Sequence, residues 1–371
     1  MSEWKEYKLG EIAEIKGGKR LPKGELLVDY ETPHPYIRVT DMGKKWIRKS
    51  GLQFVTPKVQ KTISRYVVNS GDVILSIVGS IGLVGRISQE LNGANLTENC
   101  VKLLTNKTIV NDDFLFYFLI SDEGQYEIEK RNVGSTQPKL PLYNIKDIDI
   151  FLPPLPEQKA IASILSCLDD KIDLLHRQNA TLEKMAETLF RQWFIEDAKE
   201  EWEIAKMESL ISIGSGKGLK KESFIENGLY PILGANGEIG RTNEFIFDEK
   251  LIYTGRVGTL GNIFRIENEK VWLSDNTLVI KPLGFFNFIY FTLKNSHLED
   301  YDVGSTQPLI RQSDIKEIEV VLPPIEILKE FESIANKVFQ KIKSNQTQIR
   351  TLTALRDTLL PKLMSGEIRV L

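Results

Sequence analysis

Cysteine and histidine are scarce in this chain of 371 residues, which contains two cysteines and three histidines. Cys100 and Cys167 are far apart, and His34, His176 and His297 are isolated from one another. Zinc sites need several of these residue types at short spacings, so the sequence predicts no metal site. Two distant cysteines also give no disulfide framework, which favours a reduced, cytoplasmic location.

Long apolar runs and a strong net charge are missing as well. The most apolar stretch, 73–84, is interrupted by two glycines and is too short to span a bilayer. No signal-peptide pattern begins the sequence, so we expect no membrane partner. The formal net charge is −3, and binding to nucleic acid would therefore require a locally basic face.

The sequence also lacks recognisable catalytic motifs. The sequence has no G-x-S-x-G elbow, and the stretch 214–218, GSGKG, does not fit the spacing of a phosphate-binding loop. The corners at 152–155 and 322–325 read LPPL and LPPI, without the Asp or Asn that adenine methyltransferases place in such a corner. We therefore predict a non-catalytic protein that has no catalytic residue and binds no cofactor itself.

A seven-residue apolar repeat is the strongest pattern that the sequence does contain. It extends from Pro156 to Trp193, a stretch with no glycine and no further proline. Two interleaved apolar rows with this period form the seam of a coiled-coil helix. The pattern returns over 330–360, where Pro361 should end or kink a second helix. Any amphipathic helix would show a similar pattern, but the length and the second copy favour a paired coiled coil.

We predict that the two helices pack against each other along these seams. If they overlap fully as an antiparallel pair, Asn179 should lie close to Asn345. A polar pair within an apolar seam fixes the register of two helices at some cost in stability. The predicted seam residues are Leu168, Leu175, Asn179, Leu182, Ile342, Asn345, Ile349 and Leu352.

The globular segments that precede the helices are also repeated. VGSTQP occurs at 133–138 and again at 303–308, the same offset in the numbering as the one that relates the two helices. Short strand patterns and one aromatic-rich helix, at 113–120 and 285–294, occur in both segments. We therefore predict an α/β (α+β) fold with an internal pseudo-two-fold, in which two similar mixed domains are separated by two long helices that form an antiparallel coiled coil. The predicted boundaries are 1–152 and 198–322 for the domains, and 153–197 and 323–371 for the helical regions.

Basic residues near turns are the candidates for DNA binding, since two similar domains suit the two half-sites of one DNA target. Lys and Arg would contact phosphates, and the Ser and Gln of the two VGSTQP loops would contact phosphates or base edges. A solvated turn or a capping loop is the simpler interpretation of the same residues. The candidates are Lys19, Arg20, Lys44, Lys45, Arg48, Lys49, Arg86, Ser135, Gln137, Lys217, Lys220, Lys221, Arg241, Arg256, Ser305 and Gln307.

These motifs together resemble the specificity subunit of a type I restriction–modification system. The resemblance covers essentially the whole chain and rests on WKEYKLGEIAEIKGGK at 4–19, both GSTQP loops, LPPLPEQKAIASILSCLDDKID at 152–173 and LLPKLMSGEIRVL at 359–371. The second corner, LPPIEIL, departs from the first because it lacks Pro-Glu-Gln. The resemblance implies two target-recognition domains, each reading one half of a split double-stranded DNA sequence, that alternate with two antiparallel helical regions.

The resemblance also implies partners. Two modification subunits would bind the helices, hold S-adenosylmethionine and methylate adenine, and restriction subunits would add ATP- and Mg-dependent translocation and cleavage. Two other classes of protein stay open at this stage. A methyl-transfer assay on the isolated chain would test a single-chain methyltransferase with recognition domains, and a DNA mobility shift with the assembled complex would test a coiled-coil scaffold that never contacts DNA.

Overall fold

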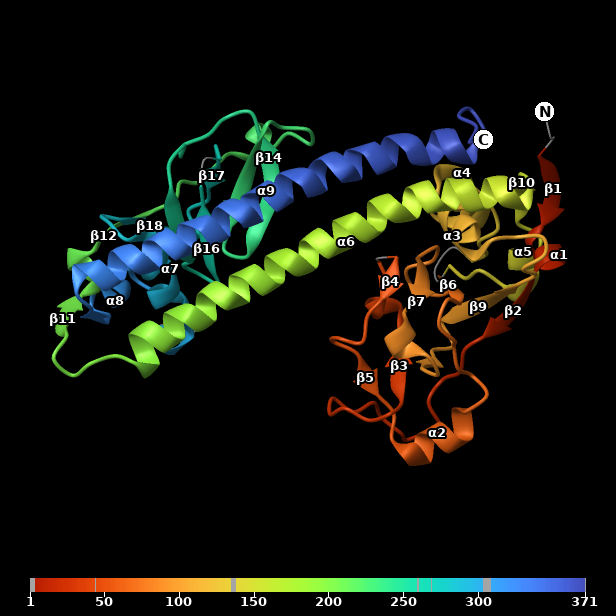
Figure 1. Cartoon of the computed structure of the whole chain (residues 1–371), viewed down its shortest axis with the longest axis horizontal. Helices are drawn as coiled ribbons and strands as arrows, with labels where there is room; N and C mark the ends of the chain where they lie inside the picture. The colour runs from red at the N-terminus through yellow and green to blue at the C-terminus, as the bar shows by residue number, and fades with distance from the viewer. Residues whose placement is uncertain are drawn as a thin grey trace. The chain divides into compact units, whose positions relative to one another are not determined.

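The computed structural model describes residues 4–43, 45–134, 138–258, 260–267, 269–302 and 308–370. The chain divides into two units, Met1–Leu175 with Thr347–Leu371, and His176–Gln346. Each unit contains one globular domain and one end of each of two long helices (Figure 1).

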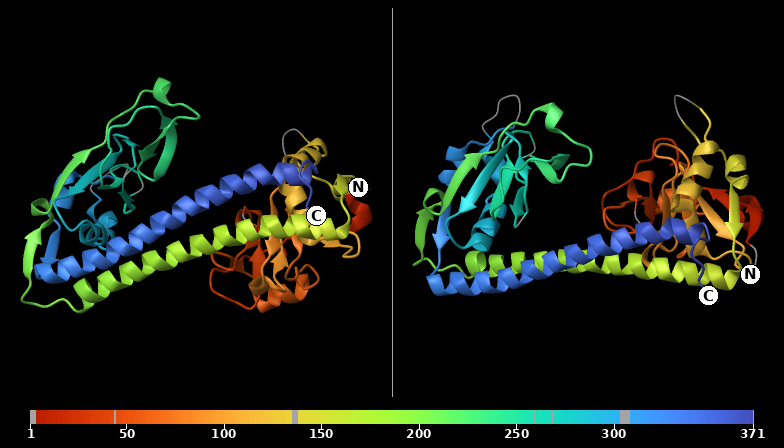
Figure 2. Two further views of the ribbon diagram at one scale, coloured as in Figure 1. Left: turned by 45° about the horizontal axis from the view of Figure 1, so that its top comes forward. Right: turned by 90° about the horizontal axis from the view of Figure 1, so that it is seen from above.

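The two long helices provide the surfaces on which the domains are built. α6 spans Leu155–Arg191 and continues as a π-helical turn, Gln192–Glu196, whereas α9 spans Ile325–Met364. Their sequences contain no glycine and keep the apolar repeat, which explains their length. In the first unit the beginning of α6 runs beside the end of α9, and in the second unit the end of α6 runs beside the beginning of α9 (Figures 1 and 2). The pairing is therefore antiparallel, as predicted.

The second helix does not end where the sequence analysis placed its end. α9 continues through Pro361 to Met364, about one turn beyond the predicted end at Leu360. Proline removes the backbone donor that would bond the carbonyl of Asp357, which is the loss of one hydrogen bond near the end of a long helix. The backbone N–H of Ser365 donates to the Pro361 carbonyl at 3.0 Å, so the turn after the proline is closed.

Three sheets form the domain of the first unit. The largest has the strand order β2-β9-β6-β7-β4, a second has the order β5-β3-β8, and β1 pairs with β10 in a ribbon where the chain enters and leaves the domain. The strands are β1 Lys5–Lys8, β2 Ala13–Gly17, β3 Pro35–Ile37, β4 Trp46–Ile47, β5 Gln53–Phe54, β6 Val73–Ser76, β7 Val84–Ile87, β8 Asn95–Leu96, β9 Cys100–Thr105 and β10 Asp149–Leu152.

Helix α3, Asp112–Ile120, lies at the centre of this domain's core. The Asn111 side chain caps it by accepting a hydrogen bond from Phe114 N at 3.0 Å, and all side chains from Phe114 to Leu119 are buried. Ile161 of α6 and Leu363 of α9 belong to the same core, so the domain is seated on both long helices. The smaller helices are α1 Leu9–Ile12, α2 Pro57–Ile63, α4 Asp122–Lys130 and α5 Leu142–Lys146.

The second unit repeats this plan. Its sheets have the orders β12-β18-β15-β16, β14-β13-β17 and β11-β19, which correspond to β2-β9-β6-β7, β5-β3-β8 and β1-β10. Helix α7, Phe286–Lys294, takes the place of α3, and α8, Gln312–Lys316, takes the place of α5. Within the described residues, β4 and α2 belong to the first domain alone. The strands are β11 Glu203–Lys206, β12 Ile211–Ser215, β13 Tyr230–Gly234, β14 Gly237–Thr242, β15 Leu251–Gly255, β16 Ile263–Ile266, β17 Trp272–Leu273, β18 Thr277–Pro282 and β19 Glu319–Leu322.

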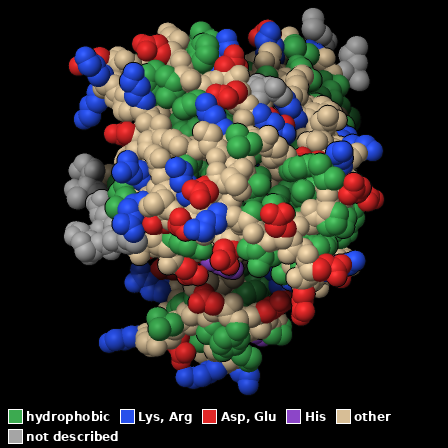
Figure 3. All heavy atoms as spheres, turned by 90° about the vertical axis from the view of Figure 1, so that its left-hand side faces the viewer, with side chains coloured by type: hydrophobic (Ala, Val, Ile, Leu, Met, Phe, Trp, Pro, Cys, Tyr) green, Lys and Arg blue, Asp and Glu red, His purple; other side chains and the backbone are tan. Residues whose placement is uncertain are grey.

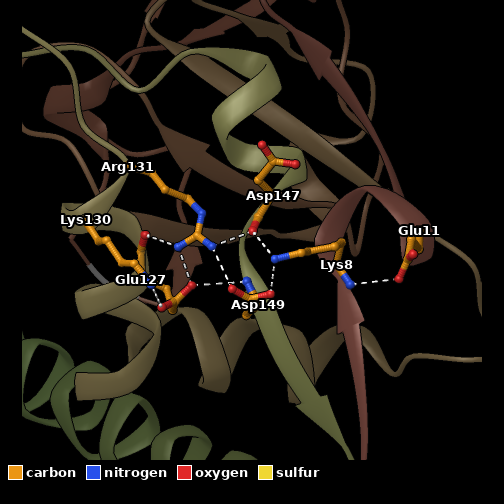
Figure 4. A network of polar contacts seen from close by, with 7 residues as sticks. All are labelled: Lys8, Glu11, Glu127, Lys130, Arg131, Asp147 and Asp149. Atoms are coloured by element: carbon orange, nitrogen blue, oxygen red, sulfur yellow. Dashed lines mark hydrogen bonds and ion pairs between the residues drawn. The ribbon is translucent and has the colours of Figure 1, made fainter.

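A cluster of charged side chains ties the two ends of the first domain together (Figure 4). Arg131, just after α4, forms ion pairs with Glu127 and with Asp149 of β10. Lys8 of β1 pairs with the same Asp149, and this contact holds the pKa of the Asp149 carboxyl below its ordinary value. Lys206 of β11 has the position of Lys8 in the second domain and also forms an ion pair. Charge therefore reinforces the ribbon in both domains.

Candidate nucleic-acid interface

A polar pair lies within the apolar helix seam of the second unit. The Asn345 side chain is fully buried, and its Nδ2 donates a hydrogen bond to Asn179 Oδ1 at 2.8 Å. The predicted proximity of Asn179 and Asn345 is therefore confirmed. The Asn345 Oδ1 atom has no hydrogen-bond partner among the described residues. An unpaired buried amide oxygen lowers stability, so this pair favours one register at a cost.

Replacing both asparagines by leucine should stabilise the chain while relaxing its helix register. The change Asn179→Leu with Asn345→Leu removes an amide oxygen that has no partner, and the free energy of unfolding should rise by about 1–3 kcal/mol. Urea unfolding of the parent and the double variant measures the difference. Asn345→Leu alone should stabilise less, because it leaves the Asn179 amide without its partner. A double variant that is less stable than the parent would contradict this account.

The other predicted seam residues line the helix pair in both units. Leu175 is buried and the remainder are half-buried, as expected of a seam that only two helices cover. They are Leu168, Leu175, Ile349 and Leu352 in the first unit, and Leu182 and Ile342 in the second.

A buried polar junction joins the first domain to the long helices. The Tyr117 hydroxyl of α3 donates to Asp169 Oδ2 of α6 at 2.7 Å, and Lys45 Nζ donates to the Tyr117 oxygen and to Ser166 Oγ. Arg356 of α9 forms an ion pair with Asp169 at 3.0 Å. The Lys45 side chain is 7% exposed, and its burial lowers the pKa of the ammonium although neighbouring carboxylates oppose the shift. Domain and helices thus share one hydrogen-bonded network.

Arg86 of β7 is a second buried cation at this polar junction. Its guanidinium lies 3.6 Å from Asp113 Oδ1, 3.8 Å from Asp112 Oδ2, and 5.9 Å from the centre of the Trp46 ring. The Trp46 ring nitrogen donates to Asp170 of α6 at 3.3 Å. The segment that leads into β4 is therefore packed against α6 by an aromatic ring and buried cations.

Lys45→Met should lower the stability of the first domain. The substitution removes the donor to Tyr117 and Ser166 and one of the two cations beside Asp113, so the free energy of unfolding should fall by about 1–3 kcal/mol. Lys49→Met is the matched control, because that lysine is partly exposed and pairs with the exposed Glu31. Equal effects of the two substitutions in urea unfolding would refute a structural role for Lys45.

An aromatic junction takes the same place in the second unit. Arg265 of β16 lies over the rings of Phe286, Tyr290 and Phe339, and its guanidinium carbon is 3.2 Å from the centre of the Phe339 ring. Burial lowers the pKa of this guanidinium, and the ion pair with Glu267 opposes the shift. The stacking of Arg265 on Phe339 thus joins the second domain to α9, and the other two rings and the carboxylate belong to the domain itself.

The polar junction of the first unit and the aromatic junction of the second occupy equivalent positions in the two copies of the repeat. Arg86 and Arg265 stand at matching positions of β7 and β16, according to the strand registers of the two main sheets. Asp169 and Phe339 are equivalent positions of the helix repeat, at the offset that also relates the two VGSTQP motifs. The same helix position therefore carries a carboxylate in the first unit and a phenyl ring in the second.

The predicted DNA-contacting cations of the first domain differ in how far they are exposed to solvent. Lys19 and Arg20 are exposed; Lys19 lies over the Tyr66 ring, and Arg20 forms an ion pair. Arg48 and Lys49 are partly exposed and paired with carboxylates. Lys45 and Arg86 are buried, so in this conformation their charges face the helix junction instead of a phosphate. Lys44, Ser135, Gln137, Ser305 and Gln307 lie outside the described residues.

In the second domain the predicted cations remain at the surface. Arg241 forms an ion pair with Glu238 and donates to two backbone carbonyls. On the face shown in Figure 3, Lys and Arg side chains are interspersed with Asp and Glu. A DNA contact by these residues stays a prediction. The exposed candidates are Lys217, Lys220, Lys221 and Arg256.

A repeated glycine turn beside each VGSTQP motif was not predicted. The segments 78–82 and 257–261 read VGSIG and VGTLG, and both glycines of each turn have positive φ. Val78 forms a β-bridge with the residue after the first VGSTQP, and Val257 does so with the residue after the second. The offset between the two turns differs from that between the two helices, so a search at the helix offset misses them.

The described residues contain no group of three His, Cys, Asp or Glu side chains that could hold a metal ion. No helix in the described ranges is both long and apolar enough to cross a membrane. Cys100 is buried, which raises the pKa of its thiol to about 12 and leaves it unreactive.

Known proteins share this organisation over the whole chain. The family model of the type I restriction modification DNA specificity domain matches residues 1–184 and 199–354. The MjaIX specificity subunit of Methanocaldococcus jannaschii is 28% identical, covering 99% of this chain and 94% of that protein. The HindI specificity subunit of Haemophilus influenzae is 22% identical, covering 99% and 100%. The crystal structure of a type I restriction-modification S subunit from M. genitalium superposes with a TM-score of 0.64 at 20% identity, covering 98% of this chain and 96% of that one.

Two copies of one α/β domain, each seated on a shared pair of long helices, define a DNA specificity protein. The chain belongs to the type I restriction modification DNA specificity family. It is a non-catalytic subunit that recognises DNA sequence within a restriction–modification complex. The resemblance drawn from the GSTQP and LPP motifs is thereby confirmed.

Proposed function

We propose that each of the two domains reads one half of a bipartite target in double-stranded DNA. The supporting observation is that one fold is used twice with different surfaces. The sheet orders, the buried arginine and the seat on the long helices are repeated, whereas β4 and α2 belong to the first domain alone among the described residues. Domains that share a framework and differ in their surfaces suit two half-sites of different sequence.

The repeated loops are the proposed base-reading elements. Ser135 and Gln137 of the first loop, and Ser305 and Gln307 of the second, carry donors and acceptors that match base edges or phosphates. The exposed cations of both domains would contact the phosphates beside them.

The long helices are the proposed attachment surface for two modification subunits, with restriction subunits joining the same complex. Both helices carry exposed apolar side chains, including Leu174, Met185 and Leu355, which supports a protein interface. On this proposal S-adenosylmethionine, ATP and Mg are held by the partner subunits. The complex would act in the cytoplasm, where the DNA is.

Mapping of methylated adenines tests the proposal directly. The chain is expressed with its modification subunits, and the methylated positions of the host DNA are sequenced. The expected target has two different specified halves separated by an unspecified spacer. Modification subunits without this chain are the control and should leave the sites unmethylated. A single contiguous target would contradict the assignment of one half-site to each domain.

A further inference from the structure

A basic pocket opens on the sheet of the first domain. Lys16 of β2 and Lys102 of β9 stand directly opposite each other in the antiparallel register, so two like charges share one face of the sheet. Arg65 and Tyr66 lie beside them, and the pocket encloses about 210 Å³. Its lining contains three cationic side chains and no carboxylate among the described residues.

The charges of this pocket are only partly neutralised by the protein itself. Lys102 Nζ donates to a backbone carbonyl at 2.6 Å, and Lys16 pairs at 2.9 Å with Glu14, which is itself well exposed. Lys19 adds a further positive charge close by, with its Nζ over the Tyr66 ring at 5.6 Å from the ring centre. Like charges directly across a strand pair destabilise a sheet. A bound anion would therefore relieve the repulsion that remains between the two lysines.

The second domain shows that the fold does not require these charges. At the position of the Lys16–Lys102 pair, its strands β12 and β18 place Gly214 opposite Val279. The backbone pairing is the same, and both charges are absent. The first domain thus carries two lysines where its copy carries a glycine and a valine, so the charges are a feature of the first domain and not of the shared fold.

We propose that this pocket binds one phosphate of the DNA backbone beside the half-site that the first domain reads. The proposal rests on the proposed function, since it places DNA on this domain. The pocket is large enough to admit a phosphate group, and Lys and Arg side chains position a protein on DNA through such contacts without reading sequence. The second domain, which lacks this pair of lysines, would rely on other contacts.

Salt dependence of DNA binding is the first test. The complex of the chain with its modification subunits is titrated with target DNA at several salt concentrations. Lys16→Gln, Arg65→Gln and Lys102→Gln together should reduce the slope of log affinity against log salt by about 0.9, which corresponds to about eightfold weaker binding at 0.1 M salt. The control has the same change of charge at exposed sites of the same unit, Lys5→Gln, Lys107→Gln and Lys146→Gln, and should keep the parental slope.

Thermal unfolding of the full chain is the second test and needs no DNA. Inorganic phosphate should raise the midpoint of the parent and leave that of the triple pocket variant unchanged. In low salt without phosphate, the pocket variant should be at least as stable as the parent, because the repulsion across the strands is removed.

The outcomes separate the pocket from the proposed function. If the parent complex fails to bind its target, the function fails, and the phosphate-dependent midpoint still decides whether the pocket holds this anion. If the parent binds and the pocket variant keeps both its slope and its affinity, the phosphate contact is overturned. A pocket variant that is folded but fails to assemble with modification subunits would assign the pocket to an acidic protein segment, which also overturns the phosphate contact.

Discussion

A chain truncated after Glu201 is expected to pair with itself and to redirect methylation to an inverted repeat of the first half-site. The fragment retains the first domain and the whole of α6. Because α9 repeats the seam of α6, a second copy of α6 can take its place in an antiparallel, isologous pair. A symmetric dimer reads symmetric DNA, so the two different half-sites should be replaced by two copies of one.

The residues that differ between α6 and α9 determine how tightly this fragment pairs. Leu175 is the equivalent of Asn345 in the helix repeat, so in the homodimer Asn179 should face Leu175 in place of Asn345. By the same equivalence, Asp169 should lose Arg356 and face Ala186. A buried amide or carboxylate that loses its partner costs about 1–3 kcal/mol. The fragment should therefore pair more weakly than the helices of the full chain.

The test compares two versions of the fragment. Residues 1–201 and the same fragment with Asn179→Leu are each expressed with the modification subunits, and the dimer affinity and the methylated sites are measured. The leucine variant should dimerise more tightly and methylate the same inverted repeat, since the seam does not contact the target. A fragment that stays monomeric in both forms, or one that methylates the parental asymmetric target, would refute the duplicated-unit account.

Phe331→Ala should cause the largest loss of stability of any single substitution considered. Phe331 of α9 is fully buried and contacts the rings of Phe190, Trp193, Phe194 and Phe291. Truncation of a buried phenylalanine removes apolar contact and leaves a cavity, which together lower the free energy of unfolding by about 3–5 kcal/mol. The second domain would lose its seat on the helices, and DNA binding by the complex should fall with it.

A phenylalanine at the surface provides the control for this effect. Phe151 of β10 is 43% exposed, and Phe151→Ala should change the free energy of unfolding by less than about 1 kcal/mol. Urea unfolding of the two variants separates cavity formation from the general effect of removing a ring. Similar losses for both substitutions would show that the aromatic cluster around Phe331 does not dominate the second unit's stability.

The helices, the repeat and one close contact could be predicted from the sequence because they depend on regular spacing. A seven-residue period identifies a helix seam without further information, and the constant offset between the two helices paired Asn179 with Asn345. Short apolar runs in both globular segments likewise indicated strands, and β6 lies in the most apolar stretch of the sequence. Local pattern and tertiary structure agree at these elements.

Burial of cations could not be predicted in the same way. Lys45 belongs to a basic run whose pattern resembles a solvated turn, and only its contact with Ser166, far along the chain, makes it a buried donor. Arg86 and Arg265 correspond structurally, but unequal lengths of the two domains hide the match from a comparison at one spacing. The basic pocket has the same origin, because Lys16 and Lys102 meet only through the β2–β9 register.

The chemistry of the two helix junctions limits which domains can be exchanged between positions of such a chain. A first domain moved onto α9 would present the Tyr117 hydroxyl to Phe339, a ring that cannot accept this hydrogen bond as Asp169 does. A second domain moved onto α6 would keep the two rings of α7 but would bring Arg265 to the Asp169 carboxylate in place of the Phe339 ring. New DNA specificities assembled by recombination within this architecture would therefore be viable mainly when the break falls outside the junction, so that each domain travels together with its own stretch of helix.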